Sequence, residues 1–200
     1  MNRLLFATNN QHKVDEIQNA IGRSIEVISL RQAGIDIDIP EPHDTLEANA
    51  SEKSATIYRL TGMNCFSEDT GLEVAALQGE PGVHSARYAG EGRSFGKNIE
   101  KLLHNLEGCR DRRARFRTVI SLILEGKEYL FEGICEGSIL DKPAGDKGFG
   151  YDPVFVPFGA GRSFAEMTLA EKASYSHRRK AADQLVAFLR SQSTHQPLQS

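Results

Sequence analysis

The order of apolar patterns along this 200-residue chain constrains its fold more than any single motif. In the N-terminal part, segments with the pattern of buried strands alternate with segments of helical periodicity. They are strands at Arg3–Ala7 and Ile25–Ser29 and helices at Gln11–Ile21 and Thr45–Leu60. Such alternation favours parallel pairing. Farther on, Ala114–Leu124 and Lys127–Ile134 form a predicted hairpin about Glu125-Gly126, which adds antiparallel strands. The sequence therefore predicts an α/β fold with a mixed β-sheet.

The remaining elements are shorter or lie nearer the C-terminus. Two short strands flank an acidic turn, and an amphipathic helix, another short strand and a last helix follow: Cys65–Ser67, Leu72–Ala75, Lys97–Leu106, Val154–Val156 and Ser176–Arg190. Thr45 and Ser176 are expected to cap their helices, and Gly22 and Gly62 to end theirs. Residues 191–200 lack apolar periodicity, so we expect a disordered tail after one domain that spans residues 1–190.

The acidic turn carries chemistry that is typical of an enzyme. Glu68 and Asp69 are adjacent carboxylates, Thr70 supplies a hydroxyl, and Gly71 follows directly. Acids at the end of a strand can bind Mg²⁺ or activate water, because hard cations prefer oxygen ligands. The alternative is an acidic surface turn without a ligand.

Charge argues against a nucleic-acid partner. The formal net charge is −3, whereas a phosphate backbone demands a basic face. Five arginines gather at Arg110, Arg112, Arg113, Arg115 and Arg117. We interpret this arginine cluster as a solvated turn and strand face, with a nucleic-acid patch as the alternative.

Cysteine usage and hydropathy indicate the compartment. Cys65, Cys109 and Cys135 are far apart and form no C-x-x-C motif, so we expect reduced thiols. No segment approaches the ~20 apolar residues that a membrane span needs. The first apolar run reaches the polar Thr8 too soon for a signal peptide. A soluble, cytoplasmic protein is therefore expected.

Two polar clusters in the first part of the chain suit a triphosphate. A strand and a helix are joined by Thr8-Asn9-Asn10-Gln11-His12-Lys13, where free N–H groups and a positive helix end can hold a phosphate. The alternative is an asparagine-rich cap with a solvated lysine. Glu41 lies between two prolines and Lys53 on the following helix, although each also fits a surface position.

Two further clusters suit a planar base. Phe149 lies between two glycines, so a base could approach the backbone and stack on the ring, and Asp152 could accept its N–H groups. The alternative is a glycine turn with a core phenylalanine. Lys172 follows a predicted capping box, and His177 and Arg178 would lie in the first turn of the last helix. Basic residues there oppose the helix dipole, which indicates an anion or a carbonyl ligand rather than a functionless basic turn.

Five motifs occur in order along the chain: F-A-T-N-N-x-x-K, S-E-D-T-G-L-E-V, G-x-P-G-V-H-S-A-R-Y-A-G, G-F-G-Y-D-P-V-F and S-H-R-x-K-A. With them the sequence resembles the inosine/xanthosine triphosphate pyrophosphatases, house-cleaning enzymes that remove deaminated purine nucleotides. The resemblance extends from about Arg3 to Leu189. It implies that ITP, dITP and XTP are hydrolysed to the nucleoside monophosphate and pyrophosphate, which keeps them out of DNA and RNA.

The resemblance also implies Mg²⁺ and a homodimer. Each subunit would have two lobes around an elongated sheet with flanking helices, and the active site would lie in the cleft between the lobes. By position, Asp69 matches the general base and a metal ligand, and Glu41 a second metal-binding acid. The matching substrate-binding positions are Thr8, Asn9, Asn10, Gln11, His12, Lys13, Lys53, Thr70, Phe149, Gly150, Tyr151, Asp152, Lys172, His177 and Arg178.

Residue chemistry supports this activity and leaves two rivals. A donor such as Arg178 beside the purine 6-position favours a carbonyl over adenine's amino group, and such a mismatch can discriminate roughly 10⁴-fold. One rival is a triphosphate pyrophosphatase for another base, such as a modified pyrimidine. The other is a non-catalytic nucleotide-binding protein, which would not need Asp69, Glu41 and Lys13 together.

Overall fold

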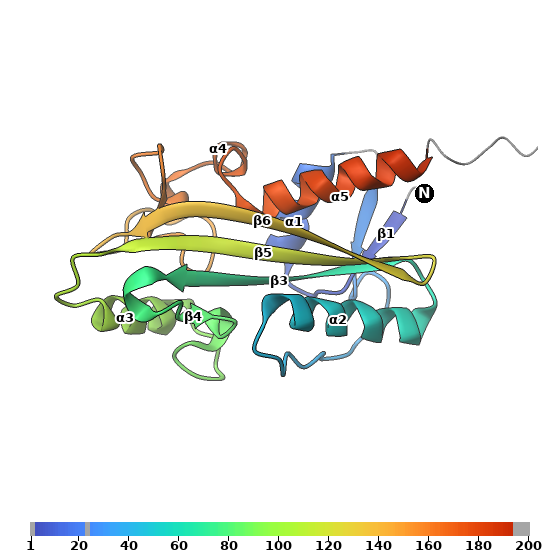
Figure 1. Cartoon of the computed structure of the whole chain (residues 1–200), viewed down its shortest axis with the longest axis horizontal. Helices are drawn as coiled ribbons and strands as arrows, with labels where there is room; N and C mark the ends of the chain where they lie inside the picture. The colour runs from blue at the N-terminus through green and yellow to red at the C-terminus, as the bar shows by residue number, and fades with distance from the viewer. Residues whose placement is uncertain (1–2, 23–24, 194–200) are drawn as a thin grey trace, which may run out of the picture.

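A mixed β-sheet forms the centre of the computed structural model, which describes residues 3–22 and 25–193 (Figure 1). Within these residues the sheet has seven strands in the order β2-β1-β3-β5-β6-β7, with β4 paired to β3. They are β1 (Arg3–Phe6), β2 (Glu26–Ser29), β3 (Cys65–Val74), β4 (Pro81–Gly82), β5 (Arg113–Leu124), β6 (Lys127–Ile139) and β7 (Phe155–Pro157). β1 runs parallel to β2 and β3, and the other pairs are antiparallel. The predicted α/β fold with a mixed sheet is confirmed.

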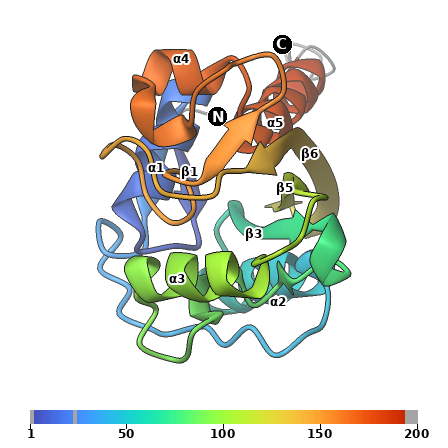
Figure 2. The ribbon, with the colours of Figure 1, turned by 90° about the vertical axis from the view of Figure 1, so that its left-hand side faces the viewer.

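Helices flank the long strands on both sides. α4 (Leu169–Ala173) and α5 (His177–Ser193) lie above β3, β5 and β6 in Figure 1, and α2 (Leu46–Thr61) and α3 (Phe95–Asn105) lie below them. α1 (Gln11–Ile21) is drawn behind β5 and β6 and shares a core with α5. Seen end-on, α3 faces the orange chain that connects β6 to β7 (Figure 2). Short 3₁₀ turns occur at Ala75–Leu77, Ser85–Arg87 and Phe164–Glu166.

The helix ends are fixed by the caps that the sequence predicts. Thr45 Oγ1 accepts an N–H from the first turn of α2 at 3.2 Å, and Gly62 ends this helix with a φ of 66°. The side chain of Ser176 does the same for α5, at 3.3 Å. Thr168 and Glu171 form the predicted capping box at the start of α4. These bonds satisfy N–H groups that the helices themselves leave unpaired.

The hairpin and the element boundaries agree with the sequence apart from a few residues. Glu125 and Gly126 both have positive φ, 51° and 79°, as a two-residue turn between β5 and β6 requires. β6 extends five residues beyond its expected end at Ile134, to Ile139. The last helix also continues past its expected end, so the first residues of the expected tail, up to Ser193, are helical. Residues 194–200 of that tail lie outside the described residues.

The predicted acidic turn is wrong, because Glu68, Asp69 and Thr70 lie in the middle of one continuous strand. β3 pairs with β5 without interruption from Cys65 to Val74. Both of these acids are buried, Glu68 at 2% and Asp69 at 6% exposure. Buried carboxylates normally break a strand pattern, but here cations from distant parts of the chain compensate their charge.

Two apolar cores lie at opposite ends of β3. Phe6 and Phe66 stack with ring centroids 4.3 Å apart in the core beneath α1 and α5. Leu72 and Phe116 belong to a second core, which packs against α3 through Leu102. The polar residues of β3 separate Phe66 from Leu72, so they lie where the two cores meet. The sequence of β3 thereby places a polar site at this boundary.

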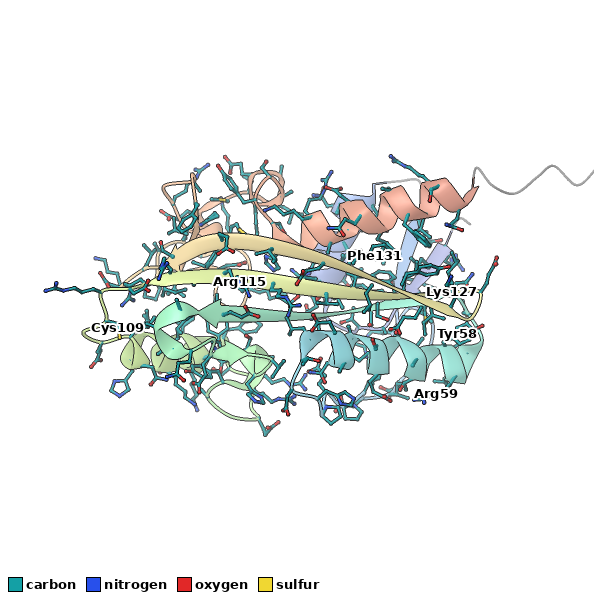
Figure 3. The ribbon with its side chains drawn as sticks, in the orientation of Figure 1. Tyr58, Arg59, Cys109, Arg115, Lys127 and Phe131 are labelled. Carbon is teal, nitrogen blue, oxygen red and sulfur yellow. The ribbon has the colours of Figure 1, made fainter. Side chains whose placement is uncertain are left out.

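The arginine cluster lies on a charge-balanced face. Arg115, whose position on the long strands Figure 3 shows, bonds Glu73 at 2.7 Å. Arg117 bonds Glu47 and Glu132, and Arg113 bonds Asp111 at 2.7 Å. Arg110 and Arg113 are exposed, as the predicted solvated face requires. The prediction is wrong for Arg112, which donates to three backbone carbonyls. Within residues 3–22 and 25–193, no helix is both long enough and apolar enough to cross a membrane.

Candidate active site

A pocket of about 470 Å³ lies where the two cores meet. All but two of the predicted site residues line it: Thr8, Asn9, Asn10, Lys13, Glu41, Lys53, Asp69, Thr70, Phe149, Gly150, Tyr151, Asp152, Lys172, His177 and Arg178. The two exceptions are Gln11, which bonds Asp15 at 2.7 Å, and His12, whose ring stacks on Phe149 with centroids 5.1 Å apart. Segments from both halves of the chain thus converge on one cavity.

One wall of the pocket is the junction between β1 and α1. Asn10 is the N-cap of α1, and its side chain accepts the Lys13 N–H at 3.4 Å. The Thr8 hydroxyl accepts the Asn10 N–H at 3.1 Å, which holds the loop in shape. Within the first turn of the helix, Lys13 Nζ lies 2.7 Å from Glu68 Oε1. This loop therefore offers a helix N-terminus and a cation on the same side of the cavity.

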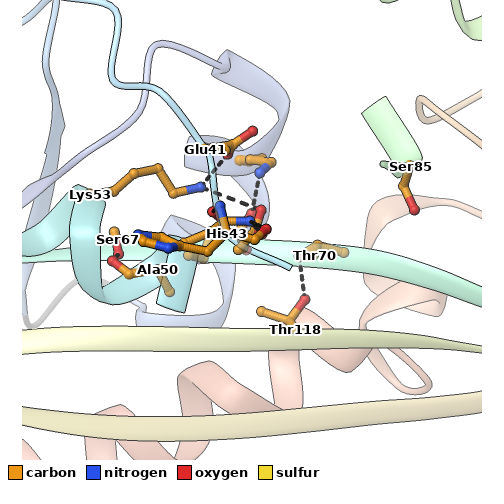
Figure 4. Close-up of polar contacts among 12 residues, drawn as sticks. Glu41, His43, Ala50, Lys53, Ser67, Thr70, Ser85 and Thr118 are labelled. Atoms are coloured by element: carbon orange, nitrogen blue, oxygen red, sulfur yellow. Dashed lines mark hydrogen bonds and ion pairs between the residues drawn. The ribbon is translucent and has the colours of Figure 1, made fainter. Parts of the chain in front are cut away.

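A second cation, Lys53, joins two carboxylates. Its Nζ lies 2.5 Å from Glu41 Oε1 and 3.4 Å from Asp69 Oδ1, contacts that Figure 4 draws. Burial alone would lower the pKa of Lys53, but the charges of Asp69 and Glu41 outweigh it and raise that pKa. Asn49 Nδ2 also donates to Asp69 Oδ2 at 3.3 Å.

Asp69 itself is a weaker acid than usual. Burial raises the pKa of its carboxyl, and Lys53, which is closer to Glu41, only partly offsets this effect. A carboxylate with a raised pKa accepts a proton more readily. The strand thus presents a carboxylate suited to a general base beside a lysine.

The opposite wall is the glycine-rich loop before β7. Asp152 Oδ2 accepts the Phe149 N–H at 2.9 Å and lies 2.6 Å from Lys172 Nζ. Gly148 has a φ of +73°, and a β-carbon there would lie 2.0 Å from Asp152 Oδ2, so only glycine fits. Burial raises the pKa of Asp152, and Lys172 partly offsets it. The loop holds an aromatic ring and an acid in fixed relation.

A buried ion network joins the two walls. Arg178 Nε lies 2.6 Å from Glu68 Oε2, and its Nη2 donates to Glu68 Oε1 at 3.1 Å and to Thr70 Oγ1 at 3.4 Å. Its Nη1 bonds Glu16, which also lies 2.7 Å from Lys172 Nζ. Burial opposes the ionisation of Glu68, but Arg178 and Lys13 keep the pKa of this carboxyl well below its usual value.

His177 lies beside this network as a neutral imidazole. Its ring stacks on Phe116 with centroids 4.6 Å apart. Burial lowers the pKa of His177 well below 6.5, and the charges of Arg178 and Lys172 add to this effect. In the described part of the chain, His177 Nδ1 is the one buried side-chain nitrogen or oxygen without a hydrogen-bond partner. A buried polar atom of this kind calls for a ligand, since leaving it unpaired is costly.

Comparison with known proteins identifies the family. The model of the Ham1 family matches residues 4–188. The chain belongs to the Ham1 family. A protein of Christiangramia forsetii named dITP/XTP pyrophosphatase is 49% identical over 187 residues, which cover 94% of this chain and 98% of that protein. A protein of the same name from Flavobacterium johnsoniae is 48% identical over 187 residues, which cover 94% of this chain and 97% of that protein.

Solved Ham1 structures share the fold as well as the sequence. The Ham1 protein of Staphylococcus aureus superposes with a TM-score of 0.86 at 39% identity, covering 96% of this chain and all of that one. The Ham1 protein of Coxiella burnetii gives the same TM-score at 34% identity, and the superposition covers 96% of this chain and all of that one. The resemblance that the five motifs predict is therefore confirmed.

The sequence motifs leave several residues in or next to this pocket of the Ham1 protein without a role. Glu16 lies one helical turn after Lys13, and this spacing places both on one face of α1. Glu68 was visible as an acid, but its bidentate contact with Arg178 was not. Arg93 and Phe95 also line the pocket, although no motif marks them.

Proposed function

We propose that this chain is a nucleoside triphosphate pyrophosphatase that hydrolyses deaminated purine nucleoside triphosphates, namely ITP, dITP and XTP. The observation that carries the proposal is a single pocket with separate phosphate-binding and base-binding walls. The β1–α1 junction with Lys13 suits the triphosphate, and the Phe149–Asp152 loop with His177 and Arg178 suits the base. The names of the Ham1 relatives, dITP/XTP pyrophosphatase, support the same reaction.

In the proposed reaction Asp69 acts as the general base. It takes a proton from water as the water oxygen attacks the α-phosphorus, and the bond from this phosphorus to the oxygen bridging to the β-phosphate breaks. The products are the nucleoside monophosphate and pyrophosphate. The raised pKa of Asp69 suits this role. Lys13 and Lys53 line the pocket and would neutralise the phosphate oxygens, which is the main requirement of phosphoryl transfer. Lys172 instead bonds Asp152 at the base-binding wall.

The carboxylates at Lys53 fit a Mg²⁺ ion. In the described residues, no three acidic, histidine or cysteine side chains gather as a ready-made metal site. Mg²⁺, however, is usually bound through one or two carboxylates together with substrate phosphates. Glu41 and Asp69, which share the ammonium of Lys53, would hold it. When bound, Mg²⁺ polarises phosphoryl oxygens and neutralises charge that develops in the transition state.

Base selection rests on the buried groups at the other wall. Arg178 uses four of the five N–H donors of a guanidinium in the contacts with Glu68, Thr70 and Glu16, which leaves one donor for a ligand. We assign this donor and the unpaired Nδ1 of His177 to the 6-oxo side of hypoxanthine or xanthine. Adenine's amino group would leave both without an acceptor, and the cost of such a mismatch underlies the discrimination.

Assembly and location form part of the same proposal. We infer a homodimer of subunits in which residues 1–190 act as one two-lobed domain, with the active site in the cleft between the lobes. No role in binding nucleic acid is assigned, because arginines of the cluster are paired with acids. A cytoplasmic location agrees with Cys65, Cys109 and Cys135, which are all free thiols.

A substrate panel tests the proposed function. Pyrophosphate release is measured with Mg²⁺ across ITP, XTP, dITP, GTP, ATP and dUTP. The proposal predicts that ITP, XTP and dITP are hydrolysed with much higher kcat/KM than GTP and ATP. A preference for dUTP would support the pyrimidine rival, and binding of ITP without turnover would support a non-catalytic nucleotide-binding protein.

A further inference from the structure

An exposed phenylalanine on α3 faces the base-binding wall. Phe95 is the first residue of this helix, after the N-cap Ser94. Its exposure is 45%, whereas Ile99 and Leu102 on the same helix are buried in the core. Phe95 is also one of the residues that line the pocket. Single exposed apolar side chains are common, and it is the position of Phe95 that sets it apart.

The aromatic neighbour of Phe95 is the ring expected to stack on the base. The centroids of Phe95 and Phe149 are 6.2 Å apart, and their planes are inclined by 50°. Phe149 also lies near the cations of Lys172 and Arg178, at 5.1 and 5.6 Å from its centroid. Phe95 is therefore at the base end of the pocket and comes from the opposite side, since α3 faces the chain between β6 and β7 (Figure 2).

We propose that Phe95 is a second aromatic contact for the purine base and that it acts together with Phe149 on substrate binding. This inference rests on the proposed function, because it assumes a nucleotide whose base lies at this wall. Purines expose two π-faces and gain affinity from each aromatic side chain that covers them. Stacking involves the face of the purine ring and does not depend on the substituent at position 6. Phe95 therefore contributes to affinity for purines in general, and other residues select the 6-oxo group.

Kinetics of Phe95→Ala test the contact. Loss of a base contact that is made equally in the ground state and the transition state raises KM and leaves kcat unchanged. We expect KM for ITP to rise about tenfold, near the lower end of what base–aromatic stacking contributes, with kcat within about twofold. The Ki of inorganic tripolyphosphate, which has no base, should not change. Phe95→Tyr keeps the ring and should restore KM.

Phe158 provides the matched control. It is exposed by 58% and does not line the pocket, so Phe158→Ala removes the same side chain without touching the site. We expect its KM for ITP to equal that of the wild type. An unchanged KM in Phe95→Ala, or a parallel rise in the Ki of tripolyphosphate, would overturn the inference. Failure of the wild type to hydrolyse ITP would instead refute the proposed function.

A fluorescence measurement tests the contact without turnover. The chain contains no tryptophan, so Phe95→Trp introduces a single reporter at the proposed contact. We expect IMP to quench this tryptophan, because a stacked purine is close to the indole, and ribose 5-phosphate to leave it unchanged. Phe158→Trp should respond to neither compound. Equal responses of Phe95→Trp to IMP and to ribose 5-phosphate would show that the base does not reach position 95.

Discussion

Removal of Arg178 should both destabilise the protein and change its base preference. This residue is 2% exposed and holds Glu68 at 2.6 Å, with Glu16 as a second partner. In Arg178→Ala, Glu68 keeps only Lys13 and Glu16 keeps only Lys172, so one buried positive charge is lost between two acids. Breaking a buried ion pair in this way typically costs about 3–5 kcal/mol. For a chain of this size, that corresponds to a fall in Tm of about 6–20 °C.

Thermal unfolding and kinetics measure the two effects separately. Calorimetry should show the fall in Tm. Arg178→Ala combined with Glu68→Gln should recover part of it, because the second change removes the excess negative charge that the loss of Arg178 leaves in the network. kcat/KM should fall strongly for ITP and little for ATP. A Tm within about 2 °C of the wild type would refute the role of the network, on the scale set by breaking a buried pair. If kcat/KM fell by the same factor for ITP and for ATP, Arg178 would be a phosphate ligand, and its role in base recognition would be refuted.

Four further changes probe the remaining parts of the site. Asp69→Asn should lower kcat by at least about 10²-fold in a folded protein, the low end for loss of a general base, and near-full turnover would refute that role. Lys13→Ala should lower kcat/KM for ITP and for ATP by the same factor, since both carry the same phosphates. A larger fall for one of the two nucleotides would mean that Lys13 contacts the base. A β-carbon at Gly133 would lie 2.0 Å from the carbonyl oxygen of His177. Gly133→Ala should therefore displace the start of α5 and lower kcat/KM for ITP about 10²-fold, whereas Gly92→Ala, which has open space, should have no effect. Burial lowers the pKa of His177. Below about pH 6.5 the unfolded chain therefore binds a proton at this residue that the folded chain does not. The free energy of unfolding should fall there by up to about 1.4 kcal/mol per pH unit. Urea unfolding of His177→Gln at pH 7.5 and 5.5 should show a smaller loss than the wild type, and equal losses would contradict a buried neutral imidazole.

Local signals were sufficient for most of the fold. Thr45 and Ser176 cap helices as their side chains indicate, and Glu125-Gly126 turns the hairpin, because caps and two-residue turns depend on the residues that form them. The predicted site residues do gather at one pocket. That prediction came from the family resemblance of the five motifs, and not from the local structure around each residue. Motifs far apart in sequence can share a site only through the fold.

Charge compensation by residues distant in the sequence explains why the predicted acidic turn was wrong. Glu68 and Asp69 suggested a turn because carboxylates are rare inside strands, yet the cations that neutralise them come from α1, α2 and α5. Their contacts with Lys13, Lys53 and Arg178 cannot be inferred from the strand itself. Phe95 had no motif, and only its position against Phe149 gives it a candidate role.

Hydrolysis of ITP in ¹⁸O-labelled water tests the central claim most directly. If water activated by Asp69 attacks the α-phosphorus, one labelled oxygen enters IMP, and the pyrophosphate that leaves carries none. Mass spectrometry of the separated products after a single turnover should show this distribution. Label in the pyrophosphate would mean attack at the β-phosphorus, and release of orthophosphate would mean cleavage at the γ-phosphate. Either result would contradict the proposed reaction.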